Sequence, residues 1–120
     1  QPGASSVFRG SVIAYAPDVK ERVLGVDGAV LREHGEVSEH TALAMARGAR
    51  AALDVDVAVA VTGSAGPDPM EQPVGTMCVA VVTPETERTR TFRMPGDRER
   101  IRTYTSTAAM HQIRLAITDP

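Results

Sequence analysis

The stretch "VDVAVAVTG", residues 55–63, decides the fold of this chain. It is a continuous apolar run, rich in β-branched valine, that ends at a glycine. A short run of this kind is typical of a strand that is buried on both faces of a sheet. A long loop rich in glycine and proline follows it, "TGSAGPDPMEQPVGT". We therefore expect a buried strand whose C-terminal end opens into a loop, the place where open α/β sheets commonly bind ligands.

Helices are predicted before and after this strand in the sequence. Ser38 is a suitable N-cap for a helix over residues 39–54, in which apolar side chains recur at helical spacing: Ala42, Met45, Ala46, Ala49 and Leu53. Two shorter helices are predicted before it, over residues 18–24 and 28–33. Asp97 is expected to cap a long C-terminal helix with one apolar stripe, formed by Ile101, Tyr104, Ala108, Ile113 and Ile117.

Three further stretches rich in β-branched residues are predicted to be strands: residues 7–16, 77–83 and 88–94. The long helical crossover from the first of them to residues 55–63 favours a parallel pair, whereas the short turn over residues 84–87 forces an antiparallel one. The expected fold class is therefore α/β, an α/β/α sandwich with a mixed β-sheet.

Length and composition restrict the possible functions. A chain of 120 residues indicates one domain, residues 1–120. Its 13 Lys and Arg against 15 Asp and Glu give a formal charge of −2, so we expect neither a nucleic acid nor an anionic membrane as partner. Cys78 is the only cysteine, which fits a reducing cytoplasm, and no apolar run approaches the roughly 18 residues of a membrane span. We expect a soluble, cytoplasmic protein.

Lys20 stands in an unusual place for a lysine. It is predicted to lie in the first turn of the helix over residues 18–24, where backbone N–H groups carry partial positive charge. The charged form of a partly buried lysine is disfavoured there, so that a neutral amine becomes accessible as a general base. Tyr15, at the end of the preceding strand, could hydrogen-bond to that amine or to a nucleophile. The alternative is a surface lysine paired with Asp18 or Glu21.

The loop after residues 55–63 is a candidate anion site. Glycines let backbone N–H groups approach an anion closely, and the hydroxyls of Thr62 and Ser64 add donors. The loop is neither a Walker loop nor a dinucleotide-binding fingerprint. Its candidate residues are Thr62, Gly63, Ser64 and Gly66, and the alternative is an ordinary tight loop.

The start of the C-terminal helix is a second candidate anion site. Its N–H groups and the side chains of Arg98, Arg100 and Arg102 offer positive potential. The alternative is a solvated helix start, in which the arginines form salt bridges with capping carboxylates.

No metal site is expected. The three histidines, His34, His40 and His111, share no ligand-like spacing with one another or with Cys78. Cys78 lies midway along an apolar strand, so we expect a buried core thiol rather than a nucleophile.

Four segments in this order resemble the C-terminal domain of the CinA family, the competence/damage-inducible protein A family. The resemblance covers nearly the whole chain, from about Pro2 to Ile117. The segments that carry it are "GSVIAYAPDVKERVLGVD" (10–27), "LREHGEVSEHTALAMARGAR" (31–50), "VAVAVTGSAGPDPMEQPVGT" (57–76) and "MPGDRERIR" (94–102).

The resemblance implies an enzyme, because active members of the family are nicotinamide-nucleotide amidases. They hydrolyse the carboxamide of nicotinamide mononucleotide to nicotinic acid mononucleotide and ammonia, with a serine nucleophile, a lysine base and no metal or cofactor. By this resemblance Lys20 is the base and Tyr15 assists it. The mononucleotide would be held by Thr62, Gly63, Gly66 and Arg98, and a homodimer is implied.

The resemblance also implies a segment before Gln1. In the family the nucleophilic serine lies upstream of a turn that corresponds to "PGAS", residues 2–5. We therefore expect the serine, with one strand and one helix, to precede the chain. The alternative is a non-catalytic domain that binds a nucleotide or a partner.

Overall fold

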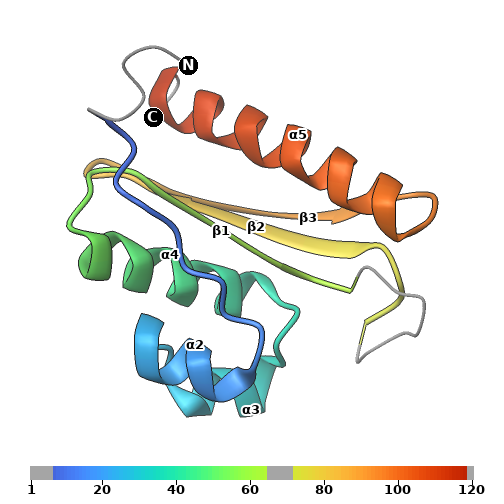
Figure 1. The fold of residues 1–120 in the computed structure, drawn as a ribbon, viewed down its shortest axis with the longest axis horizontal. Helices are drawn as coiled ribbons and strands as arrows, with labels where there is room; N and C mark the ends of the chain where they lie inside the picture. Colours follow the sequence, from blue (N-terminus) through green and yellow to red (C-terminus); the bar gives the residue numbers. More distant parts are fainter. Residues whose placement is uncertain (1–6, 65–71, 119–120) are drawn as a thin grey trace.

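Three layers of secondary structure make up the computed structural model, which describes residues 7–64 and 72–118. A three-stranded sheet forms the middle layer. Helix α4 covers one face of it, with α2 and α3 beyond, and α5 crosses the other face (Figure 1). The α/β/α sandwich predicted from the sequence is confirmed. The elements in chain order are α2 (Pro17–Leu24), α3 (Gly28–His34), α4 (Glu39–Leu53), β1 (Ala58–Gly63), β2 (Thr76–Val82), β3 (Glu87–Arg93) and α5 (Arg98–Thr118).

The sheet has the order β1-β2-β3, and both strand pairs are antiparallel. Ala60 of β1 lies opposite Ala80 of β2, and Val79 of β2 lies opposite Arg90 of β3. Every residue of the central strand β2 is buried, as expected for a strand covered by helices on both faces. Strand β1 lies at an edge, and its outward-facing Val59 is partly exposed, so the burial expected on both of its faces is incomplete.

Residues 7–16 do not form the predicted strand, and the parallel pair expected with β1 is absent from the described part of the chain. The segment keeps the alternation of a strand, because Val12 and Ala14 pack against the core while Ile13 and Tyr15 are exposed. Both the segment and β1 line a cavity, and no backbone ladder joins them. The β-branched composition that predicted a strand thus goes with an alternating, extended segment, but it did not determine the pairing.

Helix α4 packs closely on its neighbours. Its predicted N-cap is confirmed, since the Ser38 hydroxyl accepts a hydrogen bond of 3.0 Å from the N–H of Thr41. Ala42 and Ala46 face the core and are fully buried. A Cβ atom on Gly48 would overlap the carbonyl oxygen of Leu24, so this glycine allows α2 to lie directly against α4.

Helix α5 begins as predicted, with the Asp97 carboxylate accepting a hydrogen bond of 2.9 Å from the N–H of Arg100. Its predicted apolar stripe is only partly confirmed: Ile101 is buried and Ala108 and Ile113 are half-buried, but the fully buried positions beyond Ile101 carry small or polar side chains. Tyr104 and Ile117 are exposed instead. The buried residues of α5 are Ile101, Thr105, Ala109, Gln112 and Ala116.

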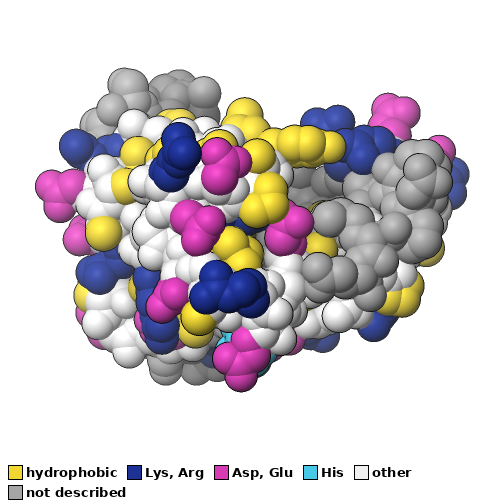
Figure 2. Space-filling view, turned by 90° about the horizontal axis from the view of Figure 1, so that it is seen from below, with side chains coloured by type: hydrophobic (Ala, Val, Ile, Leu, Met, Phe, Trp, Pro, Cys, Tyr) yellow, Lys and Arg dark blue, Asp and Glu magenta, His cyan; other side chains and the backbone are white. Residues whose placement is uncertain are grey.

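The surface around α2, α3 and α4 carries charges of both signs. Figure 2 shows Lys and Arg side chains interspersed with Asp and Glu on this face, in keeping with the formal charge of −2. None of the helices within residues 7–64 and 72–118 combines the length and the hydropathy that a bilayer span requires.

Candidate functional site

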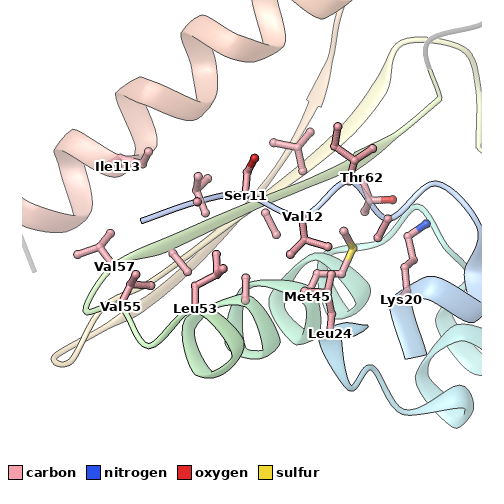
Figure 3. A pocket seen from close by; sticks show the side chains of 18 of the residues that line it. Ser11, Val12, Lys20, Leu24, Met45, Leu53, Val55, Val57, Thr62 and Ile113 are labelled. Atoms are coloured by element: carbon pink, nitrogen blue, oxygen red, sulfur yellow. The ribbon is translucent and has the colours of Figure 1, made fainter. Parts of the chain in front are cut away.

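An open cavity of about 1650 Å³ lies between residues 7–17, β1 and the C-terminal half of α5. Lys20 points its amine toward Thr62 at one end of it (Figure 3). Val55, Val57 and Ile113 line the other end, which is apolar (Figure 3). The cavity brings together six of the residues predicted from the sequence, which are Tyr15, Lys20, Thr62, Gly63, Ser64 and Arg98. Gly66, also predicted, lies outside the described residues.

Lys20 is buried and paired. It lies in the first turn of α2, as predicted, and its side chain is almost fully enclosed, with the residue 5 % exposed. Its Nζ donates a hydrogen bond of 2.9 Å to Oε1 of Glu36. The alternative of a surface lysine paired with Asp18 or Glu21 is therefore wrong.

Lys20 is also the only lysine among the 13 lysines and arginines of the chain. A guanidinium stays protonated in proteins, whereas an amine can give up its proton and act as a base. The one lysine of the chain thus lies on the wall of the cavity.

Glu36 was not found by sequence reasoning. It follows Gly35, whose carbonyl accepts a hydrogen bond of 2.6 Å from the Thr41 hydroxyl and so fixes the bend before α4. The carbonyl of Glu36 accepts a hydrogen bond of 2.7 Å from the Thr62 hydroxyl, while its carboxylate holds Lys20. Glu36 thus connects α2 to the end of β1. Nothing in the sequence spacing signals this link, because 16 residues separate the two charges.

The end of β1 is held by hydrogen bonds within the protein. The Thr62 hydroxyl, predicted as a donor to a ligand, donates to Glu36 instead. The N–H of Ser64 donates to the Thr76 carbonyl at 2.9 Å, and the Ser64 carbonyl accepts from the N–H of Gly75 at 2.6 Å. A Cβ atom on Gly63 would collide with the Met77 side chain, so the glycine is needed for close packing of β1 on β2.

Tyr15 and Arg98 lie at the exposed margin of the cavity. The Tyr15 side chain is 87 % exposed, and within residues 7–64 and 72–118 its hydroxyl has no hydrogen-bond partner. Among the described residues the Lys20 amine therefore bonds to Glu36 and not to the Tyr15 hydroxyl. Arg98 is the first residue of α5, and of the three arginines predicted at this helix start it is the one that lines the cavity.

Two groups with shifted pKa values, Cys78 of β2 and Glu39 of α4, contact strand β3 and lie away from the cavity. Burial raises the pKa of the Cys78 thiol, whose Sγ lies 3.6 Å from the Thr91 hydroxyl, so the predicted core thiol is confirmed. Hydrogen bonds from Thr91 and Thr89 lower the pKa of the Glu39 carboxyl. Among the described residues there is no group of three or more His, Cys, Asp or Glu side chains that could hold a metal ion.

Comparisons with known proteins agree on one family. The sequence profile described as CinA C-terminal domain matches residues 1–117. The CinA-like protein of Frankia casuarinae is 47 % identical over 114 residues, which are 94 % of this chain and 26 % of that protein. The CinA-like protein of Mycobacterium leprae is 45 % identical over 123 residues, 99 % of this chain and 29 % of that protein. The chain thus spans less than a third of the length of these relatives.

Solved structures show the same fold. A competence-damaged protein (CinA) superfamily protein from Klebsiella pneumoniae superposes with a TM-score of 0.90 at 28 % identity, over 94 % of this chain and 72 % of that one. The competence/damage inducible protein CihA from Agrobacterium tumefaciens gives a TM-score of 0.78 at 36 % identity, over 82 % and 62 %.

Proposed function

Since this chain belongs to the CinA family, through the C-terminal domain that residues 1–117 match, we propose that it is the catalytic domain of a nicotinamide-nucleotide amidase. The reaction is hydrolysis of the carboxamide of nicotinamide mononucleotide to nicotinic acid mononucleotide and ammonia. The observation that carries the proposal is the buried Lys20, which is held at 2.9 Å by Glu36 on the wall of a large cavity. A buried amine whose proton can leave is what a serine amidase without a metal requires of its base.

In the proposed mechanism a serine expected before Gln1 attacks the carboxamide carbon. Lys20 Nζ takes the proton from the serine hydroxyl as the C–O bond forms, and then gives it to the nitrogen of the leaving ammonia as the C–N bond breaks. Water hydrolyses the resulting acyl-serine, with Lys20 again accepting a proton and returning it to the serine oxygen. The Glu36 carboxylate is partly exposed, so it offers the proton of the Lys20 ammonium a route to water before the first step.

The remaining residues bind and orient the substrate in this proposal. Gly63, Gly66 and Arg98 hold the ribose and phosphate of the mononucleotide, whereas the Thr62 hydroxyl, which donates to the Glu36 carbonyl, supports the wall beside Lys20. Tyr15 orients the serine and Lys20, which requires its exposed ring to turn inward over the cavity. Residues 11–16 are free of any strand ladder and are the segment that would have to move.

Ammonia release from nicotinamide mononucleotide by the full-length gene product tests the proposal. Lys20→Ala is expected to lower kcat/KM by about 10²- to 10⁴-fold, the usual contribution of a general base. Lys20→Arg keeps the positive charge beside Glu36 but removes the base, so it is expected to lose as much. Arg22→Ala, on the exposed side of the same helix, is the matched control and should be close to wild type.

Two results would overturn the assignment. Turnover at the wild-type rate in Lys20→Arg would show that only the charge of this residue matters. Tight binding of nicotinamide mononucleotide by the wild-type protein without ammonia release would instead favour a non-catalytic nucleotide-binding domain.

A further inference from the structure

The hydroxyl of Ser64 is buried and yet unused. Ser64 follows the last residue of β1, is 2 % exposed and lines the cavity. Within residues 7–64 and 72–118 no group forms a hydrogen bond with its Oγ. The Nε2 atom of Gln112 is the other such buried atom of the described chain, and Gln112 does not line the cavity.

Thr62 and Ser64 differ although they lie on the same face, two residues apart. The Thr62 hydroxyl donates to the Glu36 carbonyl and so belongs to the framework. The N–H and the carbonyl of Ser64 are also engaged, with Thr76 and Gly75. The Ser64 hydroxyl is therefore the polar group of this residue that remains available to a bound molecule.

A buried hydroxyl without a partner costs folding free energy, because it loses its hydrogen bonds to water. A ligand that brings an acceptor oxygen into the cavity restores the lost bond. A site that is built to hydrogen-bond one group of its substrate also discriminates against molecules that lack the group. The position of the unpaired hydroxyl thus points to a contact with a ligand rather than to a role in packing.

We propose that the Ser64 hydroxyl donates a hydrogen bond to a phosphate oxygen of the nucleotide that binds in this cavity, an inference that rests on the proposed function. Glu36 binds both Lys20 and Thr62, so these two residues lie at the same end of the cavity. In the proposed mechanism the carboxamide reacts at this end. Ser64 lies about 7 Å farther along the strand direction than Thr62, at about 3.3 Å per residue. Arg98 lines the same cavity and supplies the positive charge that a phosphate prefers.

Calorimetry on the full-length protein tests this contact with three probes: nicotinamide mononucleotide, ribose 5-phosphate and nicotinamide riboside. Ser64→Ala is expected to raise Kd about tenfold or more for the two phosphorylated probes, because a hydrogen bond to a charged group is lost. Kd for the riboside, which has no phosphate, should not change. The Tm should stay constant or rise, because the variant removes a hydroxyl that is unpaired in the free protein.

Thr107→Ala is the control, since its exposed hydroxyl bonds only to the Thr103 carbonyl of its own helix. It should change neither Kd nor ammonia release. Equal Kd values for nicotinamide mononucleotide in wild type and Ser64→Ala would overturn the contact, as would a large fall in Tm. A loss confined to the mononucleotide and the riboside would overturn the phosphate assignment and place the contact on the nicotinamide riboside half.

The same preparations separate this inference from the proposed function. If the wild type binds nicotinamide mononucleotide without releasing ammonia, the amidase proposal fails while a tenfold loss in Ser64→Ala still supports the contact. If the wild type binds none of the three probes, both proposals are overturned.

Discussion

Helices α4 and α5 cover opposite faces of one sheet in different ways. Helix α4 turns small and apolar side chains to the strands, and Gly48 brings it directly against α2. Helix α5 buries Thr105 and Gln112 and leaves large apolar side chains such as Ile117 exposed. Figure 1 shows that α5 lies along the face of the sheet opposite α4, and its C-terminal half borders the cavity. The difference teaches that close packing is concentrated on the α4 face, whereas the α5 face provides the opening that a ligand needs.

The largest expected effect is a difference in stability between substitutions in the two halves of α5. Ile101 is fully buried against the sheet, while Ile117 is 58 % exposed beside the cavity. Ile101→Ala is expected to lower the free energy of unfolding by about 4 kcal/mol, because it leaves a cavity in the core. Ile117→Ala, the same change on the same helix, should cost less than about 0.5 kcal/mol. Urea unfolding measures both, and equal losses would mean that α5 is packed uniformly along its length.

Gly48→Ala tests how closely α4 packs against α2. The added methyl group meets the Leu24 carbonyl, which belongs to a backbone and must shift as a whole. We expect a loss of about 3 kcal/mol, in spite of the gain of about 1 kcal/mol in helix propensity.

Gly28→Ala is the matched control for this change. Its methyl group meets chiefly the end of the flexible Glu21 side chain, which can move aside. Unfolding midpoints that fall equally in the two variants would contradict the close contact between α2 and α4.

Two ion pairs differ in burial: Lys20–Glu36 is largely enclosed, whereas Arg47–Glu87 is exposed. Glu36→Gln leaves the ammonium of Lys20 buried without a counter-charge and should cost about 2 kcal/mol, less than a fully buried pair because Glu36 is partly exposed. Glu87→Gln breaks the exposed pair with Arg47 and should cost under about 1 kcal/mol. Unfolding at low and high salt checks this, because salt should weaken only the exposed pair. Equal losses of stability in the two variants would contradict the predicted difference between the buried and the exposed pair.

The smallest expected effect is a gain. Gln112 is buried on α5, and its Nε2 has no hydrogen-bond partner among the residues that the structure describes. Gln112→Leu removes this amide at similar volume and should leave stability unchanged or raise it by up to about 1 kcal/mol. A clear fall in Tm for this variant would show that the Gln112 amide has a hydrogen-bond partner, which would contradict the prediction.

Local chemistry could be predicted from the sequence, and long-range pairing could not. Ser38 and Asp97 were identified as caps because a cap depends on neighbours three residues away. Residues 7–16 alternate as a strand does, but whether a strand pairs depends on a partner far along the chain. The stripe of α5 was misassigned because Ala109 and Ala116 approach the sheet more closely than Tyr104 or Ile117 can.

In the candidate site, too, local features could be predicted from the sequence and long-range contacts could not. Lys20 and Thr62 were identified from helix position and loop composition, and the cavity brings them together. Glu36 could not be found, because its role depends on how the bend before α4 meets α2 and β1. The Ser64 hydroxyl was noted as one donor among several, and only the hydrogen-bond pattern separates it from Thr62.

Because Lys20 is the only lysine of the chain, a reagent for side-chain amines can react at one residue alone. Dyes and cross-linkers that react with lysine find no exposed side-chain amine on residues 1–120, because Lys20 is enclosed. A reagent small enough to enter the cavity would label Lys20 alone in this part of the protein. The rate of that labelling would report directly whether Glu36 holds the amine and whether the cavity is occupied.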